Sequence, residues 1–73
     1  IIVDPPRTGL SAAALEALGG AGIPDIVYIS CNPATQARDV HLLGEKGYVL
    51  ASLQPLDMFP QTQHIEVIAL LRK

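Results

Sequence analysis

The sequence predicts an α/β fold with strands and helices in the order β-α-β-α-β-β. Short apolar runs rich in β-branched residues end at proline, serine or aspartate, as buried strands do. Two longer segments between them are rich in helix formers and begin with capping residues. Such alternation implies parallel βαβ units in a doubly wound sheet. No helix separates the last two strands, so we expect the last strand to run antiparallel.

Composition narrows the class of protein. The chain has 73 residues, of which 49% are hydrophobic, and a formal net charge of -2. This length fits one small domain. A single cysteine excludes an internal disulfide, and no Cys/His cluster indicates a structural metal. There is no basic excess of the kind that attracts nucleic acids and no apolar run of membrane-spanning length. A free thiol is consistent with a reducing cytoplasm.

The first half of the chain supplies a strand and a helix. Residues 1–4 (IIVD) are predicted to form a buried strand, because the Pro-Pro pair that follows stops a β-branched run. The segment 11–20 is predicted to be a helix. Ser11 can cap its start, and Gly19 and Gly20 can end it.

A second strand and helix follow. Residues 25–30 (DIVYIS) are predicted to be another buried strand. Asn32 then offers a capping side chain, and Pro33 suits the first helical position. This helix is expected to reach about Gly44, with Ala37, Val40 and Leu43 at helical spacing and Gly47 closing the connection.

The last part of the chain is predicted to be two strands joined by a loop. Residues 48–57 form the third strand, with Pro55 weakening its far end. A loop at 57–64 leads to the fourth strand at 65–71 (IEVIALL).

Three chemically capable residues are expected to meet at one edge of this sheet. Ligands of open α/β sheets bind beyond the carboxyl ends of the parallel strands. Asp4 and Cys31 occupy two such ends. Glu66 lies near the start of the final strand, which enters from the same edge if it is antiparallel.

Cys31 and Glu66 each allow two interpretations. A thiolate is nucleophilic, and the N–H groups of a helix start favour it, but free cysteines are also often small core residues. Glu66 alternates with Ile65 and Val67, and a carboxylate on an apolar face costs free energy unless it is paired or functional. It suits a general base, or it is a strand-end charge that reaches water.

Weaker candidates surround these two. Asp4 can accept hydrogen bonds from a ligand or form a turn before proline. Arg7 can pair with Asp4 or contact a phosphate, although lone arginines are more often surface charges. His64 can orient Glu66 or touch a ligand, although lone histidines are more often structural. Met58 and Phe59 can pack over a planar base or in the core.

Three blocks of sequence carry a resemblance to a known family. DPPRTGL (4–10), YISCNPAT (28–35) and LDMFPQTQHIE (56–66), in this order and spacing, closely resemble the C-terminal part of the RNA uracil-5-methyltransferases. The resemblance covers essentially the whole chain. It implies that residues 1–73 are the C-terminal part of a Rossmann-like class I methyltransferase domain. The residues of the last two blocks, SCNPAT and DMFPQT, resemble the 23S ribosomal RNA branch more than the tRNA branch.

The resemblance also implies roles. Such enzymes use S-adenosylmethionine to make 5-methyluridine in tRNA or ribosomal RNA. Cys31 would be the nucleophile and Glu66 the proton acceptor, while Asp4 would lie in the pocket for cofactor and target base. Arg7 and His64 are further candidates for contacts with the RNA substrate.

The rest of such an enzyme would precede Ile1. That part would hold the glycine-rich S-adenosylmethionine motif, any RNA-binding domain and, in some relatives, the cysteines of a 4Fe-4S cluster. We therefore expect a fragment of a cytoplasmic enzyme of ribosomal RNA processing, with no metal ligands of its own, that does not methylate RNA alone.

Two rival functions are kept. RNA cytosine-5-methyltransferases also use a cysteine on carbon 6, but they usually carry another cysteine in the block that matches DPPR. This chain has Asp4 there and no second cysteine, which disfavours that class. The other rival is a non-catalytic α/β interaction module in which Cys31 is structural.

The first strand generates a prediction about association. With its neighbours on one side upstream of Ile1, residues 1–4 are expected to leave a long apolar edge, and such edges pair with other chains. The isolated chain should therefore self-associate. Sedimentation velocity at high concentration is expected to show oligomers, and monomer alone would contradict the prediction.

Overall fold

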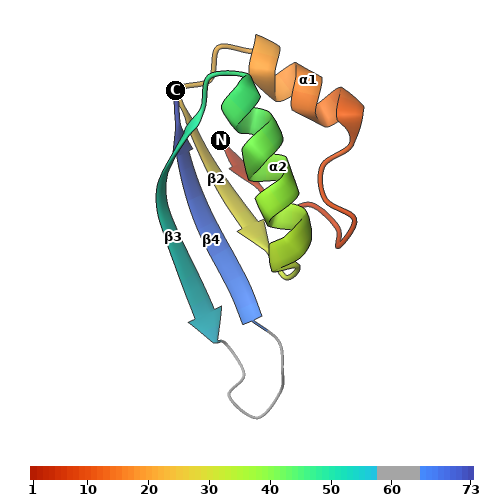
Figure 1. Ribbon diagram of the computed structural model, residues 1–73, viewed down its shortest axis with the longest axis vertical. Helices are drawn as coiled ribbons and strands as arrows, with labels where there is room; N and C mark the ends of the chain where they lie inside the picture. Colours follow the sequence, from red (N-terminus) through yellow and green to blue (C-terminus); the bar gives the residue numbers. More distant parts are fainter. Residues whose placement is uncertain (58–64) are drawn as a thin grey trace.

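The computed structural model describes residues 1–57 and 65–73 and confirms the predicted element order (Figure 1). The predicted loop at 57–64 lies outside the described residues, except for Asp57, which ends a strand. The elements are β1 (Ile2–Val3), α1 (Ala12–Gly20), β2 (Asp25–Ser30), α2 (Pro33–Glu45), β3 (Val49–Asp57) and β4 (Ile65–Arg72).

The strands form one mixed sheet in the order β1-β2-β4-β3. β1 runs parallel to β2, with Ile2 opposite Val27. β4 lies between β2 and β3 and runs antiparallel to both, so the prediction for the last strand is confirmed. Pro55 sits within β3, at the edge of the sheet, where a residue without an N–H is tolerated.

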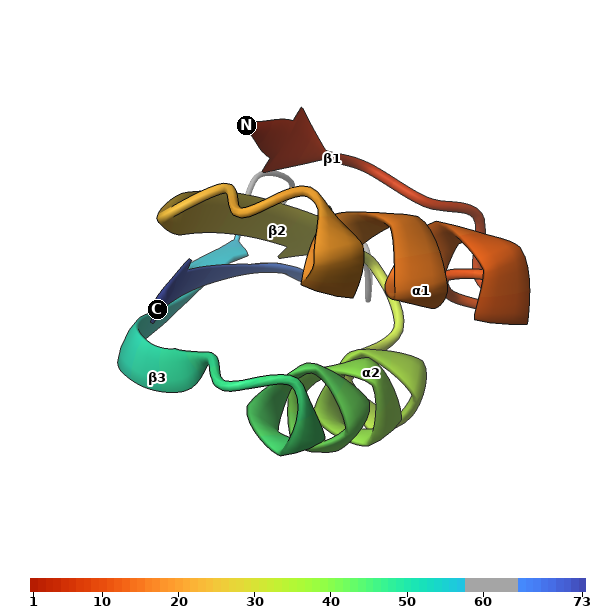
Figure 2. The same ribbon diagram turned by 90° about the horizontal axis from the view of Figure 1, so that it is seen from above.

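Both helices cover the same face of the sheet (Figure 2). A doubly wound sheet has helices on both faces, and the described residues supply those of one face. The reason is the direction of the two crossovers. From β1 to β2 and from β2 to β3 the chain moves the same way across the sheet, and right-handed connections then place both helices on one side.

The hydrophobic core fills the space between the helices and the covered face. Along β2 and β4 every second side chain points into it, and each fully buried Leu or Ile contributes about 1.5–3 kcal/mol. The buried members of the cluster are Leu15, Leu18, Ile26, Tyr28, Leu43, Tyr48, Ala69 and Leu71. Neither helix of the described part is long and apolar enough to cross a membrane.

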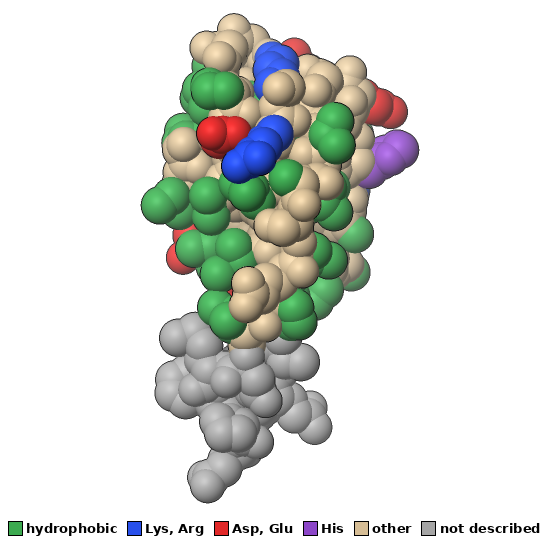
Figure 3. Space-filling view, turned by 90° about the vertical axis from the view of Figure 1, so that its left-hand side faces the viewer, with side chains coloured by type: hydrophobic (Ala, Val, Ile, Leu, Met, Phe, Trp, Pro, Cys, Tyr) green, Lys and Arg blue, Asp and Glu red, His purple; other side chains and the backbone are tan. Residues whose placement is uncertain are grey.

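The other face of the sheet is not covered within the described residues. Val27, Ile29, Ile68 and Leu70 point to it and are only half-buried. Figure 3 views this side and shows hydrophobic side chains gathered across it. The prediction that residues 1–4 form a buried strand is wrong, since Ile2 lies on this face, is 70% exposed, and belongs to an edge strand of two residues.

The predicted helix ends are largely confirmed. Ser11 caps α1 by accepting a hydrogen bond from the amide of Ala14, and Asn32 caps α2 with Pro33 as its first residue. The glycine pair forms the last two residues of α1. Gly47 has φ +101°, a conformation that glycine adopts without strain, and it turns the chain from α2 into β3.

The buried side of α2 differs from the one expected. Ala37 is exposed and Val40 half-buried, whereas Gln36 and Asp39 are buried beside Leu43. The amide Nε2 of Gln36 donates to the main-chain oxygens of Tyr28, at 3.2 Å, and Val67, at 2.9 Å. Gln36 therefore joins β2 to β4 on the face of the sheet that the helices cover.

Tyr28 generates a prediction about stability and pH. Its hydroxyl donates to Asp39 Oδ2 at 2.6 Å, and burial together with this carboxylate raises the pKa of the phenol above its ordinary 10.0. A raised pKa in the folded state means that this stabilisation is present below pH ~10 and is lost as the pH rises further. Tyr28→Phe should lower the free energy of unfolding at neutral pH by about 1.5–3 kcal/mol.

The measurement is urea unfolding, followed by circular dichroism, between neutral and alkaline pH. Tyr28→Phe should flatten the loss of stability above pH ~10. Tyr48→Phe is the matched control, because the Tyr48 hydroxyl donates to main-chain oxygens and not to a carboxylate. An alkaline loss of the same size in Tyr28→Phe as in the unaltered chain would contradict the prediction.

Candidate active site

The pairing register brings Cys31 and Glu66 to the same end of neighbouring strands. Ser30, the last residue of β2, lies opposite Val67 of β4. Cys31 follows Ser30, and Glu66 precedes Val67 on a strand of opposite direction. Cys31 and Glu66 are therefore each one residue beyond the last pair that these two strands form.

Asp4 lies at the same edge. β1 is parallel to β2, and Val3 pairs with Tyr28, so Asp4 directly follows the carboxyl end of β1. Asp4 is exposed, whereas Cys31 and Glu66 are half-buried. Arg7 lies three residues further on and is also exposed. His64, Met58 and Phe59 lie outside the described residues.

The turn at Cys31 is held by the side chain of Ser30. The hydroxyl of Ser30 accepts from the amide of Asn32 at 2.9 Å and donates to the main-chain oxygen of Asn32 at 3.1 Å. The Ser30 side chain thus spans the cysteine and fixes the path from β2 into α2. Cys31 is a free cysteine outside the buried core cluster. The start of a helix, where N–H groups lack helical partners, favours negative charge.

The loop that carries Asp4 and Arg7 is tied to the first turn of α2. Asn32 Nδ2 and Thr35 Oγ1 both donate to the main-chain oxygen of Arg7, at 3.1 and 2.9 Å. These contacts were not predicted from the sequence, where Asn32 was expected only to cap the helix. The signal was the amide itself, which has a second polar group left for another partner.

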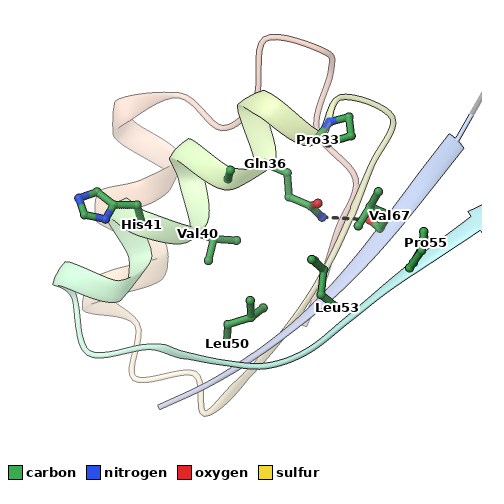
Figure 4. Close-up of a pocket in the computed structure, with 9 residues that line it drawn as sticks. Pro33, Gln36, Val40, His41, Leu50, Leu53, Pro55 and Val67 are labelled. Carbon is green, nitrogen blue, oxygen red and sulfur yellow. Dashed lines mark hydrogen bonds between the residues drawn. The ribbon is translucent and has the colours of Figure 1, made fainter.

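An apolar groove lies elsewhere in the described part of the chain. It has a volume of about 490 Å³ and lies between α2 and β3, with the Gln36–Val67 hydrogen bond beneath it (Figure 4). Val67 lines the groove, and its neighbour Glu66 points to the opposite face of the sheet. Neither Asp4 nor Cys31 lines it either. The candidate site is therefore the end of the sheet at which β1 and β2 finish, and not this groove.

In residues 1–57 and 65–73, no group of three or more His, Cys, Asp or Glu side chains is arranged to hold a metal ion. The edge presents one thiol and two carboxylates from three separate segments. Such a set can supply a nucleophile and a proton acceptor for one reaction.

Comparison with known proteins gives consistent matches. The family model of the tRNA (uracil-5-)-methyltransferases matches residues 1–73. A Fusobacterium nucleatum protein named as an uncharacterized RNA methyltransferase is 53% identical over 73 residues, and one of the same description from Nanoarchaeum equitans is 53% identical over 73 residues. All of the chain is aligned in both cases, against 16% of each relative.

A solved structure is similar as well. The crystal structure of the Pyrococcus abyssi tRNA (uracil-54, C5)-methyltransferase in complex with S-adenosyl-L-homocysteine superposes with a TM-score of 0.85 at 47% identity. The match covers 96% of this chain and 17% of that protein. The chain thus spans about a sixth of the length of the proteins that it matches, 16% to 17%.

The cap of α2 generates a prediction about the cysteine. Asn32→Ala removes the cap and the link to Arg7, so it should lower the free energy of unfolding by about 1–2 kcal/mol. It should also speed the reaction of Cys31, the only thiol, with a thiol reagent in the native state. Ser11→Ala, which removes the cap of α1, is the matched control and should leave that rate unchanged. Equal rates in both variants would contradict the account of the turn.

Proposed function

The chain belongs to the tRNA (uracil-5-)-methyltransferase family, and from this premise we propose that it is part of an enzyme that methylates carbon 5 of uracil in RNA. Residues 1–73 would be the C-terminal part of its methyltransferase domain. The observation that supports the proposal is the pairing of Ser30 with Val67, which leaves Cys31 and Glu66 each one residue beyond this pair at the same end of the sheet. This reaction needs a nucleophile and a base that both reach the same ring.

Cys31 is the proposed nucleophile. Carbon 5 of uracil is too poor a nucleophile to attack a methyl sulfonium. When the thiolate sulfur adds to carbon 6, the electrons of the 5,6 double bond move onto the oxygen of carbon 4 as an enolate. Carbon 5 of this enolate is nucleophilic, so covalent addition divides one difficult step into two easier ones.

Glu66 is the proposed base. After methylation, carbon 5 still carries its original proton. The Glu66 carboxylate removes that proton, the 5,6 double bond forms again, and the carbon 6–sulfur bond breaks to release the thiolate. A base within reach of the proton typically contributes a factor of about 10²–10⁴ to the rate. The half-buried position of Glu66 beside the cysteine fits this step.

Asp4 and Arg7 are proposed to hold the target. A base inside a helix cannot reach a thiol at a sheet edge, so the uracil must leave its stack. The exposed carboxylate of Asp4 can then accept a hydrogen bond from the polar edge of the ring. Arg7, also exposed, can contact a phosphate of the RNA. His64 stays a candidate for substrate contact.

S-adenosylmethionine is the proposed methyl donor, supported by the S-adenosyl-L-homocysteine in the solved relative. When bound, it supplies the methyl group that carbon 5 accepts. The space beside Gly9, the positive-φ glycine of the loop after β1, is filled by Thr35, Arg38 and Asp39, which leaves no cradle there. We assign donor binding to the rest of the full-length protein, with Asp4 at its border.

Two RNA substrates each have an observation in their favour. The amino-acid sequence of the SCNPAT and DMFPQT blocks favours 23S ribosomal RNA. The solved relative, a tRNA (uracil-54, C5)-methyltransferase, favours tRNA. Methylation assays of the full-length protein on transcripts of both kinds decide between them.

The proposed roles predict different failures for two variants of the full-length protein. Cys31→Ala should give neither 5-methyluridine nor a covalent adduct. Glu66→Gln should lower turnover by about 10²–10⁴-fold and accumulate a protein–RNA adduct, visible as a shifted band on a denaturing gel. The 73-residue chain alone should give no product.

Asp25→Asn is the matched control, because Asp25 is a carboxylate at the other end of β2, paired with Arg72 at 3.5 Å on the surface. It should keep full activity. Full turnover by a folded Cys31→Ala variant would make the cysteine structural and favour the non-catalytic interaction module.

A further inference from the structure

Asp39 is a buried carboxylate that the proposed reaction does not use. Its side chain is 0% exposed, although it lies on α2 two turns after Cys31. Oδ2 accepts from the hydroxyl of Tyr28 at 2.6 Å and from the amide of Leu10 at 2.8 Å. A buried charge is costly unless several donors satisfy it, so this carboxylate is retained together with a dedicated set of partners.

One of those partners, Leu10, belongs to the DPPRTGL loop. A further partner, Arg38, also contacts this loop. Oδ1 of Asp39 accepts from the guanidinium of Arg38 at 3.0 Å. The same guanidinium donates to the main-chain oxygen of Thr8 at 3.0 Å. Asp39 therefore holds Leu10 directly and orients the side chain that holds Thr8.

Gly9 shows how closely the loop and the helix approach. It is buried, with φ +84°, and its amide donates to the oxygen of Pro6 at 2.8 Å. A Cβ at this position would lie 2.6 Å from Asp39 Oδ2 and would overlap the Thr35 methyl group. The loop thus lies directly on the helix between its two anchors, with no room for another atom.

The contacts form a continuous series along α2. Asn32 and Thr35 hold the oxygen of Arg7, Arg38 holds that of Thr8, and Asp39 holds the amide of Leu10. The capping residue Asn32 directly follows Cys31, and α2 begins with the next residue. The loop that they hold begins immediately after Asp4.

We propose that Asp39 is a positioning residue: its buried carboxylate fixes the loop that carries Asp4 and Arg7 relative to the turn that carries Cys31. The inference rests on the proposed function, because it assigns the loop a contact with the target uracil. Asp39 touches neither RNA nor the reacting atoms. It acts through Leu10 and Arg38, so its loss shifts the loop and misplaces the uracil above the thiol. Misplacement of about 1 Å can cost about 100-fold in rate.

The test uses the full-length enzyme and RNA that contains 5-fluorouridine in place of uridine. Fluorine on carbon 5 cannot leave as a proton, so the adduct with Cys31 persists and its formation can be timed in a single turnover. At saturating RNA, Asp39→Asn should form the adduct about 10-fold to 100-fold more slowly than the unaltered enzyme. The final amplitude should be unchanged, because every folded molecule still reacts. A variant that is merely destabilised would instead lose active molecules, and hence amplitude, and keep its rate constant.

Gly9→Ala provides a second route to the same defect, since its methyl group would displace the loop from the other side. The double variant should be no slower than the slower single variant. Arg38→Met keeps the aliphatic stem of a side chain that is 53% exposed, and should slow the adduct even if Asp39→Asn fails to fold. His41→Ala is the matched control on α2, because His41 and its partner Glu45 are exposed, and should react at the normal rate.

Each outcome bears on the inference. Slow adduct formation at full amplitude in Asp39→Asn or Arg38→Met, with His41→Ala normal, supports it. A normal rate in folded Asp39→Asn overturns it. If Asp39→Asn does not fold, a normal rate in Arg38→Met overturns it instead. In both cases the unaltered enzyme still forms the adduct, so the proposed function stands. An unaltered enzyme that forms no adduct overturns the proposed function and this inference with it.

Discussion

One pairing register determines the geometry of the candidate site. β4 inserts antiparallel between β2 and β3, with Ser30 opposite Val67. Because side chains alternate along a strand, this register sends Val67 into the core and Glu66 to the other face, next to the end of β2. A slip of one residue would bury the carboxylate and expose the valine. The apolar pattern of β4 therefore protects the position of Glu66 as well as the stability of the sheet.

A second constraint links α2 to the end of the sheet at which β1 and β2 finish. The Asp39 carboxylate is buried among donors from β2, α2 and the loop after β1. Losing a partner from a buried charge typically costs about 3–5 kcal/mol, so these segments are held together as a unit. Gln36 adds a link between β2 and β4 from the same helix. Thus α2 connects all the segments that carry Asp4, Cys31 and Glu66.

Much of this could be predicted from sequence, for local reasons. Helix caps at Ser11 and Asn32 depend on neighbouring residues, and the direction of the last strand follows from the absence of a helix before it. Other features depend on residues far apart in the chain. Both helices lie on one face because of the order of the strands, and Ile2 is exposed because its strand lies at the edge. The spacing of Gln36, Asp39 and Leu43 marks one helical face, but apolar residues alone were expected there.

The proposed reaction depends on a bond between the Cys31 sulfur and carbon 6 of uracil, formed with the Glu66 carboxylate nearby. The most direct test is to trap the full-length protein on RNA that contains 5-fluorouridine, digest the adduct and locate the modified residue by mass spectrometry. We expect a nucleotide attached to the peptide that contains Cys31, and to no other. Attachment at a different residue, or a Cys31 peptide of unmodified mass in a trapped complex, would contradict it.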